Sequence, residues 1–180
     1  IVSNPHTFAP RPASRVEAYL ELLRVPNLFT AAADVTMGFL VTHGAIGCKA
    51  GKTLAALVGA SVLLYASGVV LNDVFDFEVD LRERPHRPLP SGRISLAAAQ
   101  TLGWPLALAG AALGWLAGYL AGQLRPGIVA SALAGCVVLY DGLLKRTPIG
   151  PLAMGTCRTL NVLLGMSAGA SPWQPHHLLI

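Results

Sequence analysis

Residues 53–71 read TLAALVGASVLLYASGVVL, nineteen residues without a charged side chain. A helix needs roughly 20 apolar residues to cross the hydrocarbon core of a bilayer, so this stretch has the length and composition of a membrane-spanning helix. Its glycines agree with that interpretation, because glycine is tolerated in spanning helices. The stretch therefore predicts a membrane protein.

The composition of the whole chain points the same way. Of its 180 residues, 53% are hydrophobic and 12% are charged, whereas a soluble domain carries roughly 25% charged residues. So few charges could hardly supply polar outer faces to a set of soluble helices. The high apolar content excludes disorder, and a count of three cysteines excludes a disulfide scaffold.

Four further apolar runs have spanning length: residues 18–42, 95–124, 127–144 and 150–170. The first is interrupted by Arg24, Asn27 and Asp34, and the last by Arg158 and Asn161. No run has the alternating pattern of a barrel strand. The predicted fold class is therefore all-α transmembrane, a multi-helix bundle with about five spans.

The basic residues predict how these spans are oriented. Five spans place nine Lys and Arg residues on one side of the membrane: Arg11, Arg15, Arg24, Arg82, Arg84, Arg87, Arg93, Lys145 and Arg146. The other side receives three: Lys49, Lys52 and Arg125. Since basic loops stay in the cytoplasm, we expect a cytoplasmic amino terminus, with residues 1–15 as a flexible leader and 16–180 as the bundle. The net charge of +4 is then topological, and no nucleic-acid partner is expected.

The segment that follows the uncharged run, residues 72–88, gathers five of the nine acidic residues of the chain. On a continuing helix Asn72, Asp76 and Asp80 would stack on one face, with Asp73 beside them. Stacked carboxylates need a cation, and oxygen ligands suit Mg²⁺, which completes its shell with water and phosphate. We therefore predict a diphosphate site built through Mg²⁺, the alternative being a solvated acidic helix end.

The acidic segment and the loop after it resemble a known motif. The residues that carry the resemblance are Asn72-Asp73-x-x-Asp76-x-x-x-Asp80, followed by RPLPSGRIS at residues 87–95. The motif that they resemble is the first aspartate-rich motif of the UbiA family of intramembrane prenyltransferases. Two other pieces match in order. RVPN at 24–27 resembles the Arg-x-x-Asn start of the family's first helix, and YDGLLKR at 140–146 resembles its Tyr-x-x-x-x-Lys-Arg stretch. The residues that are similar to the EboC branch of the family are Gly155, Arg158, Asn161, Gly165 and Met166.

The resemblance implies a nine-helix bundle with a second aspartate-rich motif between its sixth and seventh helices. This chain has about five spans and no second acidic cluster. We therefore expect either the amino-terminal part of such a bundle, whose catalytic competence alone is in doubt, or a degenerate protein.

The activity implied is Mg²⁺-dependent transfer of a prenyl group from a prenyl diphosphate to a small aromatic or lipid acceptor in the bilayer. Diphosphate leaves only when fixed positive charge meets its growing negative charge. The expected metal ligands are Asn72, Asp73, Asp76 and Asp80. The expected catalytic residues are Asp76, Asp80, Tyr140 and Lys145. The expected substrate-binding residues are Arg24, Asn27, Arg87, Lys145, Arg146, Arg158 and Asn161.

Several assignments stay open at this point. Arg158 and Asn161 share a helix face and serve either a cavity or interhelical hydrogen bonding. Asp34 either lines a pocket or forms a structural ion pair, and Asp141 is a candidate for acceptor deprotonation. The competing functions are a non-catalytic membrane scaffold and, less favoured, a transporter, which would need its charges at mid-bilayer depth.

Overall fold

A computed structural model describes residues 14–43 and 48–169, and all regular structure in those two ranges is helical. The predicted all-α class is therefore confirmed. The leader predicted at residues 1–15 lies outside the described residues up to Ala13, and Ser14 and Arg15 begin the first helix. The elements are α1 (Arg15–Leu23), α2 (Val25–His43), α3 (Cys48–Phe75), α4 (Phe77–Glu83), α5 (Leu96–Ala121), α6 (Arg125–Leu139), the π-helix η1 (Tyr140–Leu144) and α7 (Gly150–Met166).

The helices have the dimensions of a membrane protein. Four stretches are long and apolar enough to cross a bilayer: Arg15–His43, Ala50–Phe75, Leu96–Ala121 and Arg125–Leu144. The fifth predicted span corresponds to α7, whose 17 residues lie at the lower end of the roughly 17–25 that a span requires. The chain is an integral membrane protein.

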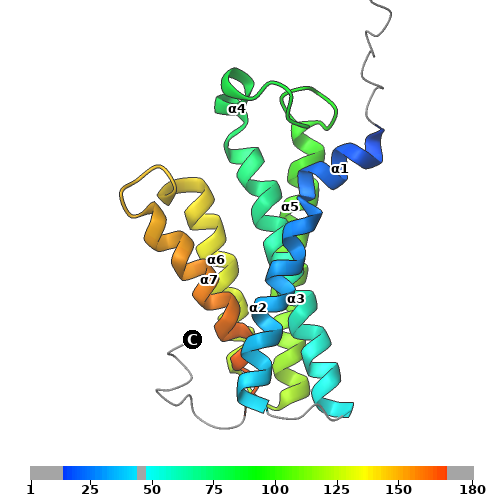
Figure 1. The fold of residues 1–180 in the computed structure, drawn as a ribbon, viewed down its shortest axis with the longest axis vertical. Coiled ribbons are helices and arrows are strands. Elements are labelled where there is room, and N and C mark those ends of the chain that lie inside the picture. Colours follow the sequence, from blue (N-terminus) through cyan, green and yellow to red (C-terminus); the bar gives the residue numbers. More distant parts are fainter. Residues whose placement is uncertain (1–13, 44–47, 170–180) are drawn as a thin grey trace, which may run out of the picture.

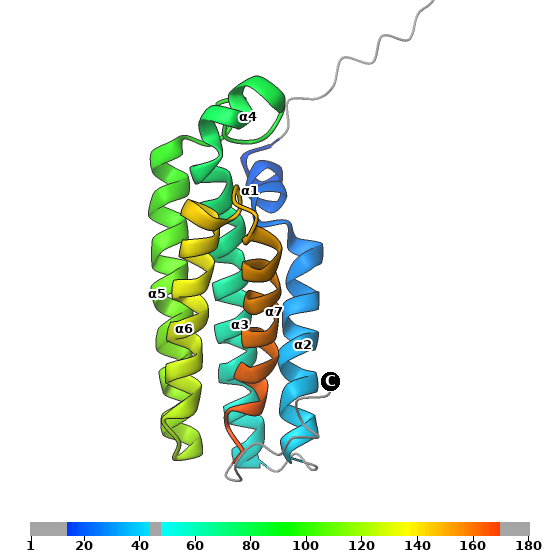
Figure 2. The ribbon, with the colours of Figure 1, turned by 90° about the vertical axis from the view of Figure 1, so that its left-hand side faces the viewer.

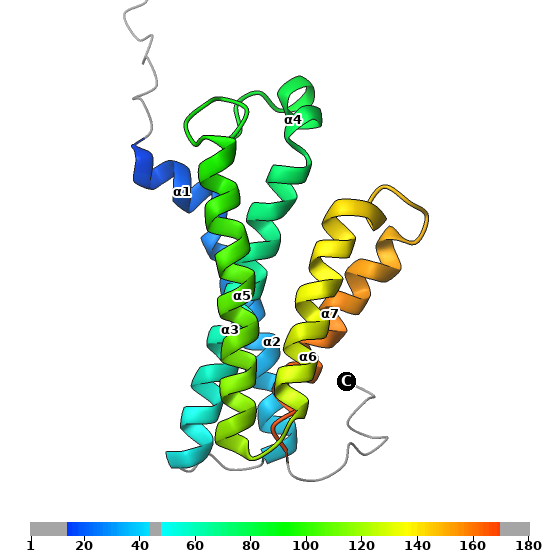
Figure 3. The same ribbon diagram turned by 180° about the vertical axis from the view of Figure 1, so that it is seen from behind.

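The helices form two groups that diverge toward one end of the molecule. α3 packs along α5 and α2, while α2 also packs along α7, and α6 lies between α5 and α7. Figures 1 and 3 show the α6–α7 hairpin leaning away from α2, α3 and α5 toward the end that carries α4. We call this end of the bundle the α4 end.

Glycines allow the closest helix contacts. Gly110 of α5 faces α3, where an added Cβ would lie 2.7 Å from Leu64 Cγ, and Gly114 faces Ala130 of α6. These two glycines therefore let α5 pack closely against α3 and α6. Two further glycines bring the backbones of α2 and α7 together, since Gly38 faces Val162 of α7 and Gly165 faces Val35 of α2.

The first predicted span is wrong in one respect, since residues 18–42 are not one helix. α1 ends at Leu23, and Arg24 adopts a left-handed conformation with φ 47° and ψ 51° before α2 begins. α1 is fixed separately, because its buried face, Ala18 and Leu22, packs in the cluster that contains Val70. The break lets α1 tilt away from the bundle axis, as Figure 2 shows.

Successive spanning helices run in opposite directions, so the basic segments lie at the same end of the bundle, as the charge pattern predicts. α1, α4 and the α6–α7 connection lie at the α4 end, while the end of α2, the start of α3 and the α5–α6 connection lie at the opposite end (Figure 2). The basic residues assigned to one side are therefore together in space wherever the structure describes them. Their cytoplasmic location stays a prediction.

Candidate functional site

Charged side chains converge where α3 ends, α4 begins and η1 ends. Lys145 Nζ lies 2.8 Å from Asp76 Oδ1 and donates to Asn72 Oδ1 at 3.1 Å. Arg146 donates to the same Asp76 oxygen at 3.0 Å. Residues distant in the sequence thus meet around Asp76, whose side chain is 17% exposed.

A second group of ion pairs lies beside the first. Arg24 donates to Asp73 Oδ1 at 2.7 Å. Arg87, from the loop after α4, is 2.7 Å from Asp80 Oδ2 and 3.5 Å from Asp73 Oδ1, and Arg84 lies 3.4 Å from the buried Asp80. We call the two groups together the entrance cluster: Arg24, Asn72, Asp73, Asp76, Asp80, Arg84, Arg87, Lys145 and Arg146.

The predicted stacking of Asn72, Asp76 and Asp80 on one helix face is wrong. α3 ends at Phe75, and Asp76, with φ −91° and ψ 2°, leads into the separate helix α4. Asp80 therefore joins Asp73 around Arg87, while Asn72 and Asp76 share Lys145. Arginine and lysine take the neutralising role that the sequence argument gave to a metal ion.

A π-helical turn positions the residues of the YDGLLKR stretch. η1 replaces the expected end of α6, and the Lys145 amide donates to the Tyr140 carbonyl at 2.9 Å to close the wider turn. Such turns occur often at functional sites. This one leaves Tyr140 and Asp141 on a cavity wall while the Lys145 side chain reaches α3.

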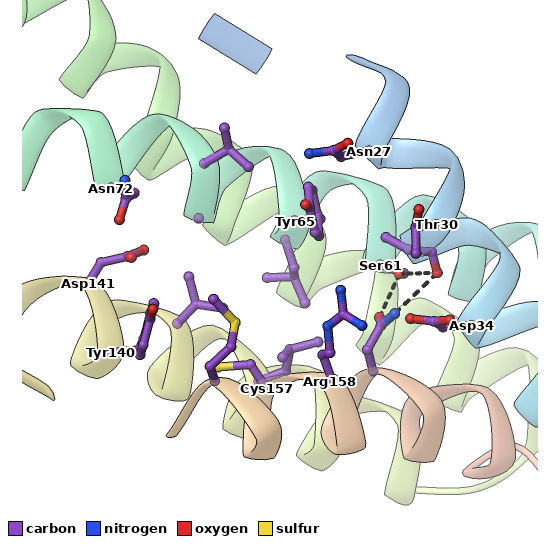
Figure 4. A pocket seen from close by; sticks show the side chains of 18 of the residues that line it. Asn27, Thr30, Asp34, Ser61, Tyr65, Asn72, Tyr140, Asp141, Cys157 and Arg158 are labelled. Carbon is purple, nitrogen blue, oxygen red and sulfur yellow. Dashed lines mark hydrogen bonds between the residues drawn. The ribbon is translucent and has the colours of Figure 1, made fainter. Parts of the chain in front are cut away.

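A cavity of about 470 Å³ lies between the two helix groups, within the range of small-molecule sites. Its walls come from α2, α3, α6, η1 and α7. Arg24 and Asn72 of the entrance cluster belong to its lining. Figure 4 shows Asn72, Tyr140 and Asp141 at one end of the cavity, and Asp34, Ser61 and Arg158 at the other, which we call the inner end.

At the inner end, Asn161 joins three helices. Its Nδ2 donates to the Ala31 carbonyl at 3.1 Å, and its Oδ1 lies 2.6 Å from Ser61 Oγ (Figure 4). Both groups of the Asn161 amide are therefore engaged in interhelical hydrogen bonds, although the residue also lines the cavity. Its predicted substrate-binding role stays a prediction.

Five of the predicted catalytic and substrate-binding residues line this cavity: Arg24, Asn27, Tyr140, Arg158 and Asn161. Arg87, Lys145 and Arg146 join it through the entrance cluster. The sequence argument missed Ser61 and Tyr65 on the same wall of α3. Ser61 and Tyr65 are four residues apart, and Tyr65 and Asn72 are seven residues apart. Residues at these intervals lie on one face of a helix, so this spacing could have identified Ser61 and Tyr65 as cavity residues.

Two thiols meet beside the cavity. Cys157 Sγ of α7 lies 3.3 Å from Cys136 Sγ of α6. The two cysteines are 21 residues apart in the sequence, and this spacing does not reveal a contact between antiparallel helices.

The acidic side of the entrance cluster offers oxygen donors alone, as Mg²⁺ prefers. Within residues 14–43 and 48–169, no three His, Cys, Asp or Glu side chains are gathered closely enough to hold a metal ion. Mg²⁺ commonly takes only one or two carboxylates together with substrate phosphate. The residues therefore fit an ion that binds together with a diphosphate, and Asn72 and Asp76 are suited to hold it because one cation already bridges them.

The electrostatics of Asp76 reflect its partners. Burial raises the pKa of its carboxyl, but hydrogen bonds and charge from Lys145 and Arg146 outweigh burial, so the pKa lies below its ordinary value. Asp76 is therefore an anion at neutral pH.

Residues 31–180 match the family model described as the UbiA prenyltransferase family. The chain belongs to this family. The match agrees with the motifs at residues 72–95 and 140–146, so the family expected from the sequence is confirmed.

Similar proteins of named activity are digeranylgeranylglyceryl phosphate synthases. The one from Saccharolobus solfataricus is 35% identical over 151 residues, covering 83% of this chain and 51% of that protein. The one from Ignicoccus hospitalis is 35% identical over 160 residues, covering 88% and 49%. The chain thus spans about half the length of the curated relatives it matches. Its likeness to the EboC branch stays a prediction.

A solved structure, described as giving structural and mechanistic insights into the biosynthesis of digeranylgeranylglyceryl phosphate synthase in membranes, has the same fold. The TM-score is 0.77 at 31% sequence identity, over 87% of this chain and 54% of that one. The helical arrangement is therefore that of a UbiA-family membrane protein.

Proposed function

We propose that the protein transfers a prenyl group from a prenyl diphosphate to an aromatic or lipid acceptor within the membrane, with Mg²⁺ as cofactor. One observation carries the proposal: a cavity of about 470 Å³ inside a membrane bundle has the entrance cluster at one end. Membership of the UbiA family supports it. The synthases of similar sequence support it as well.

The entrance cluster is suited to the departure of diphosphate. The bond between C1 of the prenyl group and the diphosphate oxygen breaks, and its electron pair leaves with the oxygen. Lys145 and Arg146 lie side by side to receive the developing charge, with Arg24 and Arg87 across the cluster. The chemistry that Mg²⁺ supplies when held by Asn72 and Asp76 is further neutralisation of the diphosphate oxygens.

The cavity wall is suited to the isoprenoid chain. Leu64, Val69, Leu133 and Val137 contribute apolar surface to it. An apolar pocket favours the hydrocarbon and keeps water from the allylic cation. Tyr140, on the same wall, places a phenol ring at the end of the cavity next to Asn72 (Figure 4).

Transfer is completed when an acceptor oxygen or ring carbon forms a bond to C1 and loses its proton. Asp141 is the proton acceptor in this proposal. Its side chain is buried in η1, lines the cavity and faces Asn72 across it (Figure 4). The entrance cluster faces the cytoplasm, where the basic loops are expected to lie.

The test is prenyl transfer in membranes by the protein expressed from its complete gene, with labelled prenyl diphosphates and a panel of aromatic and lipid acceptors. Asp76→Ala and Asp80→Ala should abolish turnover without changing membrane insertion. Glu78→Ala, which removes an exposed carboxylate of α4, is the matched control and should be silent. Unchanged transfer in either aspartate variant would remove the metal-site assignment, and no transfer by the parent would favour the scaffold.

A further inference from the structure

Two thiols that the proposed chemistry does not use meet between α6 and α7. The Cys157 thiol lies 3.3 Å from the Cys136 sulfur, and the Cys136 thiol lies 3.9 Å from the Ala153 carbonyl of α7. At 3.3 Å no atom fits between the two sulfurs. The sulfurs of a disulfide are about 2.05 Å apart, so a movement of about 1 Å brings this pair to bonding distance.

The cavity gives a small molecule access to this pair. Cys157 belongs to the cavity lining, and Figure 4 shows it on the wall between Tyr140 and Arg158. Both cysteines are half-buried, whereas fully buried structural cysteines are inert. Hydrogen peroxide is small and neutral, so a cavity of about 470 Å³ admits it.

We infer that Cys136 and Cys157 are a redox pair that a hydroperoxide converts to a disulfide joining α6 to α7. A cysteine inside a helix bundle commonly serves as a small packing residue. Packing alone does not require that a second thiol contact the first, at a cavity wall that small molecules reach. The pair, rather than either cysteine alone, therefore carries the inference.

The cavity-lining Cys157 reacts first. Its sulfur attacks one peroxide oxygen, the O–O bond breaks, and the thiol proton leaves with the departing oxygen as water. The Cys136 sulfur then attacks the sulfenic acid on Cys157, the S–S bond forms, and the hydroxyl group leaves with the Cys136 proton as a second water. Two thiols are oxidised and one hydrogen peroxide is reduced to two waters. Apolar surroundings slow formation of the reactive thiolate, so oxidation takes minutes to hours rather than seconds.

The disulfide acts on the site through η1. The Tyr140 amide donates to the Cys136 carbonyl at the end of α6, so Tyr140 and Asp141 follow a movement of Cys136. A displacement of reacting groups by about 1 Å costs up to about a hundredfold in rate. Oxidation should therefore lower prenyl transfer, an effect that rests on the proposed function.

The experiment uses the protein from its complete gene, purified in detergent, with every cysteine except Cys136 and Cys157 replaced by serine. Hydrogen peroxide should remove both free thiols and lower the intact mass by that of two hydrogen atoms. It should also raise the melting temperature by several degrees, because the link closes a loop of the chain. Dithiothreitol should reverse all three changes. Thiols that persist in peroxide, or that gain oxygen without forming a link, would overturn the inference.

Two variants test the pairing itself. In Cys136→Ala, peroxide should leave a sulfenic acid on Cys157 that dimedone traps, because the second thiol is gone. The matched control combines Cys157→Ala with Thr156→Cys, which moves the thiol to an exposed position of α7, and it should form no link to Cys136. A link of equal yield in this control would mean that the helices meet by random movement, and the inference would fail.

Prenyl transfer by the reduced and the oxidised protein keeps the inference distinct from the proposed function. A disulfide that forms in a protein without prenyl transfer supports the redox pair and counts against the proposed function. Transfer that persists in peroxide because no disulfide forms supports the proposed function and refutes the redox pair. Transfer that falls at least about tenfold on oxidation, and recovers in dithiothreitol, supports both.

Discussion

Lys145 connects two parts of the entrance cluster, because it follows η1 and contacts both Asn72 of α3 and Asp76, the residue between α3 and α4. A lysine after a membrane helix also has a simple topological explanation, since cytoplasmic ends collect basic residues. The two roles are distinguished by what happens when the charge is removed and a polar side chain is kept.

Lys145→Gln should lower prenyl transfer by about tenfold to a thousandfold, the scale of losing one charge-stabilising group. Expression and orientation should stay unchanged, since eight basic residues remain on that side. Lys52→Gln, which removes an exposed lysine at the other end of α3, is the matched control. A Lys145→Gln rate within about twofold of the parent would mean that this lysine serves only membrane orientation, and it would strengthen the scaffold alternative.

The lowered pKa of Asp76 gives a pH dependence of known sign. A carboxyl whose pKa is lower in the folded state stabilises the fold above its ordinary pKa of about 4, and this contribution is lost as the pH falls through the lowered value. The parent should therefore melt above Asp76→Asn at pH 7, and the two melting temperatures should converge below about pH 4. A difference that grows on acidification would contradict the ion pairs around Asp76.

Most residues of the entrance cluster could be predicted, because the acidic motif and the Lys-Arg pair are recognisable in the sequence. The sequence could not predict which carboxylate meets which cation. Asp80 pairs with Arg87 and Asp76 with Lys145 because the chain turns at Asp76, and a helical repeat carries no sign of that turn.

Among the elements, α2 and α7 approach each other closely at Gly38 and at Gly165. A methyl group at Gly165 would collide with the Val35 carbonyl and lie 2.9 Å from the Phe39 nitrogen. Gly155, on the same helix, has open space around an added Cβ. Replacing glycine by alanine at these two positions of α7 therefore separates the effect of packing from the effect of helix propensity.

Gly165→Ala should destabilise the protein by about 1–3 kcal/mol, as overpacking does. Gly155→Ala should be neutral or stabilising by up to about 1 kcal/mol, since alanine is the better helix former. Thermal unfolding in detergent of the two variants and the parent measures both effects. Equal behaviour of the two variants would mean that α2 and α7 do not meet as described.

The elements were predicted well in their centres and poorly at their ends. The uncharged run at residues 53–71 lies inside α3. The break at Arg24 and the π-helix at Tyr140–Leu144 were not foreseen, because each depends on contacts with other elements. Arg24 has a left-handed backbone conformation, and its side chain forms an ion pair with Asp73. Hydrophobic periodicity does not reveal such an interaction.

For the whole molecule, the distribution of charge predicts that the α4 end faces the cytoplasm. In a variant whose native cysteines are replaced by serine, Ser91→Cys should react with an impermeant thiol reagent only after the cells are opened. Lys52→Cys, at the opposite end of the bundle, should react in intact cells. The reverse pattern would contradict the predicted orientation, and with it the expectation that prenyl diphosphate reaches the entrance cluster from the cytosol.

In the proposed function, the entrance cluster binds the diphosphate of a prenyl donor with Mg²⁺ while the cavity takes its hydrocarbon chain. The most direct test is equilibrium binding of a non-reactive prenyl thiodiphosphate to the protein from its complete gene, with Mg²⁺ and with EDTA. We expect binding that requires Mg²⁺, weakens at least about tenfold in Asp76→Asn, and is unchanged in Glu78→Gln. Binding that is equally strong in EDTA and in Asp76→Asn would contradict the proposed function.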